Sequence, residues 1–195
     1  MPYVLQRIAA ACALILMSPV IAVVALAVAI DDGRPVLYRG TRIGLNGDEF
    51  TQLKFRSMLK NADALLTDVQ SDVQVNRITR VGAVIRRLSL DELPQLVNVA
   101  SGDMALIGPR PMLPDLLARV PATHPRFSVL PGITGLAQVA GRNDVKWSKR
   151  LILDAEYASD RSFAMDVRIL LETVAVVAGR KGIAADRNPS EVLDI

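Results

Sequence analysis

The chain has 195 residues, of which 51% are hydrophobic and 22% charged, and its net charge is +3. The apolar excess is concentrated at residues 8–30, where 21 of 23 residues are apolar, and the rest is roughly 45% apolar, as in ordinary soluble domains. This composition excludes a disordered chain and a polytopic membrane protein, and the single cysteine, Cys12, excludes a disulfide scaffold. We therefore expect a membrane segment at 1–32 and one compact domain at 33–195.

Three interpretations compete for the apolar segment. A cleaved signal peptide is disfavoured, because its apolar core would be only about 7–15 residues long. A helix that crosses the membrane fits by length. However, only Arg7 precedes the segment whereas three arginines follow it between 34 and 42, so the positive-inside rule is satisfied only if the N-terminus lies outside.

The third interpretation depends on Ser18 and Pro19, near the middle of the segment. Pro19 lacks an N–H and clashes with the carbonyl of Ile15, and the Ser18 hydroxyl can bond to the backbone that is freed. A break here would form a helix–break–helix hairpin that enters one leaflet and returns, with arms of about 16 Å each. From the residues alone, this re-entrant hairpin and a kinked crossing helix both remain open.

The rest of the chain is predicted to be a helix-dominated α+β domain with short strands. In chain order we expect strands at 36–38 and 50–55, joined by a hairpin-like connection at 44–48, then helices at 58–69, 77–88 and 90–99, a short apolar run at 104–107, Gly/Pro-rich turns at 108–111 and 131–135, and helices at 149–157 and 163–178. The apolar face of the last helix suits either core packing or an interfacial position against lipid headgroups.

Two carboxylates, Asp91 and Glu92, directly follow a basic region. Residues 77–87 contain four bases and no acid, and residues 34–60 contain six bases and two acids. Arginines bind phosphate oxygens, and carboxylates bind Mg²⁺ or attack phosphorus, so the combination suits chemistry on a phosphate. The structural alternative is a helix capping box formed by Ser89 and Glu92, although Pro94 would then occupy a position where a backbone donor is expected.

Arg110 lies between Pro109 and Pro111, whose fixed φ angles would hold it in place. Anion binding and an ordinary surface turn both remain open for this segment. The segments at 132–135 and 141–143 could expose backbone amides to phosphate. Rossmann, P-loop, zincin and nucleophile-elbow signatures are absent from the sequence. Nucleic acid is not an expected partner, because the basic segments lack interleaved aromatic residues. The residues alone therefore indicate a membrane-associated protein that binds phosphates.

Several further motifs run through the chain in order. They are RIG at 42–44 with Gly47 and Phe50, KFRSM at 54–58, RITRVG at 77–82, LSLDELPQ at 88–95, GDM at 102–104, IGPRP at 107–111, PGITG at 131–135 and GRN at 141–143. Together they resemble the bacterial sugar transferases that prime surface-glycan assembly, the monotopic phosphoglycosyl transferases. The resemblance covers residues 6–183 and is to a minimal form without a large N-terminal membrane domain.

The resemblance implies transfer of a sugar 1-phosphate from a UDP-sugar to undecaprenyl phosphate, giving undecaprenyl-diphosphate-sugar and UMP, in the first membrane step of glycan assembly. The family's carboxylate dyad falls on Asp91 and Glu92. Asp91 would form a covalent phosphosugar–aspartate, and Glu92 would support Mg²⁺ binding or proton handling, so both are candidate metal ligands. Two displacements suit substrates that arrive from water and from lipid. Direct transfer with Asp91 as a general base, and a non-catalytic lipid-phosphate-binding adaptor, stay open as alternatives.

By the same resemblance, the phosphate-binding residues are expected to be Arg86 and Arg110, followed by Lys54, Arg56 and Arg142. The family's Ser-Pro helix break matches Ser18 and Pro19, which favours the re-entrant hairpin beside interfacial helices. The resemblance also implies a location on the cytosolic face of the bacterial inner membrane, with membrane lipid and downstream glycosyltransferases as partners. Three positions depart from the family's usual lysine, tryptophan and asparagine, namely Asp48, Leu136 and Ala140.

Overall fold

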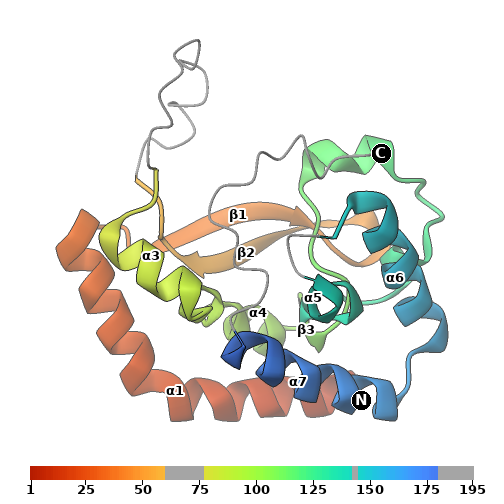
Figure 1. Cartoon of the computed structure of the whole chain (residues 1–195), viewed down its shortest axis with the longest axis horizontal. Helices are drawn as coiled ribbons and strands as arrows, with labels where there is room; N and C mark the ends of the chain where they lie inside the picture. Colours follow the sequence, from red (N-terminus) through yellow and green to blue (C-terminus); the bar gives the residue numbers. More distant parts are fainter. Residues whose placement is uncertain (60–76, 142–144, 180–195) are drawn as a thin grey trace.

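A computed structural model of the chain describes residues 1–59, 77–141 and 145–179. It has the helix-dominated α+β architecture that the sequence predicted (Figure 1). In chain order its elements, with η for 3₁₀ turns, are α1 (Tyr3–Asp32), β1 (Leu37–Ile43), η1 (Leu45–Gly47), β2 (Glu49–Phe55), α3 (Arg80–Arg87), η2 (Leu90–Glu92), α4 (Gln95–Ser101), β3 (Ala105–Ile107), η3 (Pro114–Arg119), η4 (Pro125–Ser128), β4 (Gly132–Thr134), α5 (Leu136–Gly141), α6 (Trp147–Asp160) and α7 (Phe163–Ala178). All but the first two residues of the helix expected at 58–69 lie outside the described residues.

Helix α1 continues through Pro19 as a single element of 30 residues, where the sequence predicted two helices separated by a break. Figure 1 shows that the helix bends instead, so that its two arms run along two sides of the domain. The Ser18 hydroxyl donates to the carbonyl of Ile15 at 2.8 Å. Pro19 has no N–H to donate to this carbonyl, so the local hydrogen bonding predicted from the sequence is confirmed. By length and composition, α1 could cross a membrane.

Both arms of α1 pack against the domain. In the N-terminal arm, Ala10 lies in a buried cluster with Val99 of α4. In the C-terminal arm, Val24 lies in a second cluster with Phe55 of β2 and Ile85 of α3. The large side chains on the other side of α1 are exposed, and they are Val4, Leu5, Ile8, Ile15, Leu16, Val20, Val23, Leu26 and Ile30.

The strands form two small sheets. β1 and β2 make the predicted antiparallel hairpin, which is longer than expected because pairing continues from Leu37↔Phe55 to Ile43↔Glu49. β3 and β4 pair in parallel. In the segment at 132–135, which could have exposed its amides, the Gly132 amide is used within the fold and donates to the Pro109 carbonyl at 2.9 Å. A Cβ atom at Gly132 would lie 2.1 Å from the Gly108 nitrogen, so only glycine allows this approach.

Two helices begin later than their hydrophobic patterns predicted. α3 begins at Arg80 rather than at residue 77, because Thr79 caps it by accepting a hydrogen bond from the Gly82 amide at 2.8 Å. α4 begins at Gln95 rather than at residue 90. Pro94 has no N–H to donate and takes the position before the helix, so the preceding residues form the separate turn η2.

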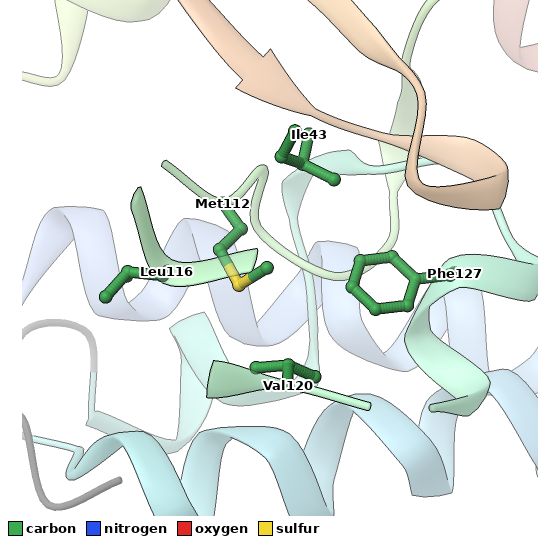
Figure 2. Packing of buried hydrophobic residues seen from close by; sticks show 5 residues of the cluster. All are labelled: Ile43, Met112, Leu116, Val120 and Phe127. Carbon is green, nitrogen blue, oxygen red and sulfur yellow. The ribbon is translucent and has the colours of Figure 1, made fainter. Parts of the chain in front are cut away.

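A buried cluster supports the segment that contains Arg110. Figure 2 shows Met112 at its centre, among Ile43, Leu116, Val120 and Phe127. Met112 also pairs with Ile43 at the end of β1, whose amide donates to the Met112 carbonyl at 2.8 Å. The chain that follows Pro111 is thereby fixed to the β1–β2 hairpin.

Candidate active site

The turn between α3 and α4 presents the two carboxylates. Ser89 adopts a left-handed conformation with φ 56° and directs the chain from α3 into η2, which contains Asp91 and Glu92. The Ser89 side chain makes no capping hydrogen bond. The capping-box interpretation of Ser89 and Glu92 is therefore wrong, and Glu92 has other partners.

Glu92 binds two cations through one oxygen. Its Oε1 accepts hydrogen bonds from Lys54 Nζ and from Arg110 Nη2, each at 2.7 Å. Lys54 comes from β2 and Arg110 from the segment between its two prolines, so the fold brings together three predicted site residues from separate parts of the sequence. Two cations on one carboxylate leave this cluster with a surplus of positive charge.

The neighbouring carboxylates have opposite pKa shifts. Burial alone would raise the pKa of Glu92, but Arg110 and Lys54 outweigh burial and hold its pKa well below the usual range. Burial, and then the charge of Glu92, raise the pKa of Asp91, although Lys54, Arg86 and Arg110 act in the opposite direction. Asp91 is thus the carboxylate whose charge is less well compensated by the protein.

A second layer of residues holds the Arg110 backbone. The Arg110 carbonyl accepts a hydrogen bond from Arg126 Nη2 at 2.7 Å. Arg126 Nη1 lies 3.2 Å from Asp154 Oδ2, and both side chains are almost fully buried. This pair was not predicted from the sequence, because nothing in the pattern of either segment indicates that η4 and α6 meet.

A pocket of about 180 Å³ opens beside Lys54 and Arg110. The residues that line it are Arg42, Gln52, Lys54, Arg110, Pro111, Leu113, Trp147 and Arg150. Among these described lining residues there are four cations and no acid. Arg42 and Arg150 were not among the predicted site residues, although Arg42 belongs to the RIG motif that could have drawn attention to it.

The remaining predicted phosphate ligands are placed differently. Arg86 is exposed at the end of α3, close enough to Asp91 to influence its pKa. Arg56 is buried at the C-terminal end of α1, where it pairs with Asp32 at 2.9 Å and donates to the carbonyls of Asp32, Gly33 and Pro35. The last carbonyls of a helix lack partners within the helix. Arg56 supplies hydrogen bonds there, so its contacts in the fold are structural. Arg142 lies outside the described residues.

The three departures from the family pattern can also be placed. Asp48 is exposed next to η1, and Leu136 and Ala140 belong to α5.

The described residues contain no group of three or more His, Cys, Asp or Glu side chains placed to hold a metal ion. Mg²⁺, however, is commonly held by one or two carboxylates together with substrate phosphates. Asp91 and Glu92 fit a site of that kind. Asp91 is the better ligand, because Lys54 and Arg110 already bind Glu92 Oε1.

Comparison with known proteins shows which family this chain resembles. A family model described as bacterial sugar transferase matches residues 2–180. An uncharacterized sugar transferase EpsL of Bacillus subtilis is 44% identical over 152 residues, which are 77% of this chain and 74% of that protein. The exopolysaccharide production protein ExoY of Rhizobium meliloti is 37% identical over 193 residues, 90% of this chain and 84% of that protein.

A further relative carries a more specific name. The UDP-glucose:undecaprenyl-phosphate glucose-1-phosphate transferase of Caulobacter vibrioides is 40% identical over 181 residues, 88% of this chain and 67% of that protein. The family model spans nearly the whole chain, including the dyad, Lys54 and Arg110. As its motifs predicted, the chain belongs to the bacterial sugar transferase family.

Proposed function

We propose that this protein transfers a sugar 1-phosphate from a UDP-sugar to undecaprenyl phosphate and releases UMP. The chain is a sugar-phosphate transferase by its family and by relatives named for that activity in Caulobacter vibrioides and in Salmonella typhimurium. The donor is proposed because two relatives, from Caulobacter vibrioides and Erwinia amylovora, are named for UDP-glucose and UDP-galactose. The observation that carries the proposal is the Asp91–Glu92 dyad beside a pocket lined by cations.

Asp91 is the proposed nucleophile. A carboxylate oxygen of Asp91 attacks the phosphorus that bears the sugar, and the bond from that phosphorus to the oxygen of UMP breaks. A phosphate oxygen of undecaprenyl phosphate then attacks the same phosphorus, the bond to Asp91 breaks, and the carboxylate is regenerated. The incomplete compensation of the Asp91 charge supports this role, because a poorly stabilised carboxylate is the more reactive one.

Glu92, Lys54 and Arg110 are proposed to hold the phosphates in place. Glu92 fixes the two cations at 2.7 Å, and their surplus charge faces the donor phosphates. Mg²⁺ bound at Asp91, together with phosphate oxygens, would neutralise charge on the phosphates. Arg86 is proposed to bind a phosphate that approaches from outside the pocket, and this is supported by its exposure and by its effect on the pKa of Asp91.

The proposed location is the cytosolic face of the bacterial inner membrane, with α1 as a re-entrant helix. Membrane association is supported by the apolar length of α1 and by relatives that act on a lipid carrier. The re-entrant arrangement is supported by the contacts of both arms with one domain, since a straight crossing would separate one arm from its partners. α7 adds an exposed apolar stripe suited to the interface, formed by Phe163, Val167, Leu171 and Val174.

The nucleophile is tested with a donor labelled on the phosphate next to the sugar, in the absence of acceptor. We expect UMP release of about one equivalent per protein and label on the peptide that contains Asp91, and neither with Asp91→Asn. Asp48→Asn, which removes an exposed acid, is the matched control and should retain the label. Turnover that requires both substrates and leaves no labelled protein would instead indicate direct transfer, with Asp91 as a general base.

The topology is tested by cysteine labelling in a variant whose Cys12 is replaced. Tyr3→Cys and Arg34→Cys place one thiol at each end of α1. An impermeant reagent should reach both thiols only from the cytosolic side if α1 is re-entrant. Labelling from opposite sides would contradict the re-entrant proposal and leave the enzymatic one intact.

A further inference from the structure

The cation-lined pocket extends beyond the residues that contact Glu92. Lys54 and Arg110 bind the carboxylate directly. Arg42 and Arg150 line the same pocket, and Trp147 lies beside them. We call Arg42, Arg150 and Trp147 the outer pocket. The chemistry proposed for Asp91 gives no role to these three residues.

The charge in the pocket suits a ligand with at least two negative charges. Glu92 and the neighbouring Asp91 offset two of the four lining cations. Asp154, whose charge also acts on Arg150, is paired with Arg126. Burial lowers the pKa of Arg150, and the charge of Arg110 lowers it further, whereas Asp154 acts in the opposite direction. Arg110 and Arg150 therefore repel one another across the pocket. A bound polyanion would relieve this repulsion and replace the water lost on burial.

The outer pocket is also shaped for more than a bare anion. The Arg150 guanidinium carbon lies 4.8 Å from the centroid of the Trp147 ring, which is the stacked arrangement of a cation–π pair. This contact, together with a hydrogen bond from Arg150 Nη2 to the Val145 carbonyl at 3.4 Å, orients the guanidinium before a ligand binds. Pro111, Leu113 and Trp147 add an apolar wall to the same cavity.

We propose that the outer pocket binds the nucleoside monophosphate portion of the donor, with Arg42 and Arg150 on its phosphate and Trp147 beside the nucleoside. This inference rests on the proposed function. In an in-line displacement the leaving group lies opposite the nucleophile, so the nucleotide must extend away from Asp91. When the bond between the sugar-bearing phosphorus and the bridging oxygen breaks, its electron pair stays on that oxygen and UMP leaves with an additional negative charge. Arg42 and Arg150 stabilise that charge.

The test uses Trp147 as a built-in reporter, because it is the single tryptophan of the chain. The full-length protein in lipid nanodiscs is titrated with UMP while the tryptophan emission is recorded. We expect a saturable change with UMP, and dissociation constants at least about tenfold weaker for uridine and for inorganic phosphate. Arg42→Ala and Arg150→Ala should each weaken UMP binding by about tenfold or more, as expected for loss of a charged hydrogen bond.

Two further variants control the result. Arg39→Ala removes an exposed cation from the same strand as Arg42 and should bind UMP as the unchanged protein does. Arg150→Lys retains the charge without the planar stack, and should bind UMP less tightly than the unchanged protein while keeping its circular dichroism spectrum. It therefore replaces Arg150→Ala if that variant fails to fold.

The outcomes separate this proposal from the enzymatic one. If UMP leaves the Trp147 emission unchanged, or if both arginine variants bind UMP as tightly as the unchanged protein, the outer-pocket assignment is overturned even when Asp91 proves to be the nucleophile. If UMP binding depends on both arginines while no sugar phosphate is transferred to undecaprenyl phosphate, the nucleotide site stands and the proposed function fails.

Discussion

Two ion clusters meet at Arg110, and they differ in the balance of positive and negative charge and in their exposure to solvent. At the pocket, Glu92 is shared by Lys54 and Arg110, so cations outnumber carboxylates. Behind it, one arginine faces one aspartate, Arg126 and Asp154, out of contact with solvent. Arg126 joins the two clusters through the Arg110 carbonyl.

The pKa values of Glu92 and Asp154 show the consequence of this difference. The pKa of Glu92 lies far below its usual range, because its two cations outweigh burial. Burial raises the pKa of Asp154 to about 6 even though Arg126 and Arg150 oppose it. A cluster with excess charge, open to a pocket, is suited to bind an anion, whereas a balanced and enclosed pair is suited to hold the backbone around it.

The largest effect is expected from breaking the enclosed pair. Arg126→Met leaves Asp154 buried without its cation and removes the support of the Arg110 carbonyl. We expect the free energy of unfolding to fall by about 3–5 kcal/mol, measured by chemical denaturation in detergent micelles. The double variant Arg126→Met/Asp154→Leu should recover part of this loss. A single variant as stable as the unchanged protein would contradict the structural role of the pair.

The next effect concerns the cluster at the pocket. Glu92→Gln removes the carboxylate charge that positions Lys54 and Arg110, so sugar-phosphate transfer should fall by about 100-fold. Inorganic phosphate should raise the thermal stability of this variant by more than it raises that of the unchanged protein, because an anion between Lys54 and Arg110 can replace the missing charge. Arg126→Met should gain no more from phosphate than the unchanged protein does. An equal additional gain in both variants would remove the distinction between the clusters.

A third, smaller effect separates the clusters by pH. The folded state holds a proton on Asp154 more readily than the unfolded chain does between about pH 4 and 6, because its pKa is raised to about 6. The stability contributed by Asp154 is therefore largest below about pH 4. It falls as the pH rises to about 6, by at most about 1.4 kcal/mol per pH unit. Glu92 acts in the opposite direction, because its pKa is lowered. The stability that it contributes is lost only when the pH falls below the usual pKa range of a glutamate.

Denaturation curves collected across this pH range test the difference. Asp154→Asn should flatten the dependence between pH 4 and 6. Glu156→Gln, which changes an exposed acid on the same helix, should leave it unaltered. If both variants keep the slope of the unchanged protein, Asp154 does not titrate in this window.

The sequence predicted the pocket cluster far better than the enclosed pair. Asp91, Glu92, Lys54 and Arg110 lie in motifs, and the conflict between Pro94 and a capping box was visible in advance. By contrast, a basic stretch does not reveal which of its members will meet a helix end, as Arg56 does.

Contacts between segments that are distant along the chain could not be predicted from the sequence either. Arg126 and Asp154 are brought together only by the packing of η4 on α6. Trp147 of α6 packs against the cluster that contains Phe127 of η4, and it lines the pocket together with Arg150. The local sequence pattern predicts that α6 is a helix, with its core at 149–157. It does not predict which segments pack against that helix.

The smallest expected effect distinguishes whether the positive charge of Arg110 or the planar shape of its guanidinium is required for transfer. Glu92 receives a single hydrogen bond from Arg110, through Nη2, and a lysine can supply one donor with the same charge. If surplus charge defines the cluster, Arg110→Lys should reduce transfer by only about tenfold or less, whereas Arg110→Met should reduce it by at least about 100-fold. Rates measured for both variants at saturating donor decide the question. Equal losses would mean that the planar guanidinium is required, and the positive charge alone would no longer explain what distinguishes this cluster from the enclosed pair.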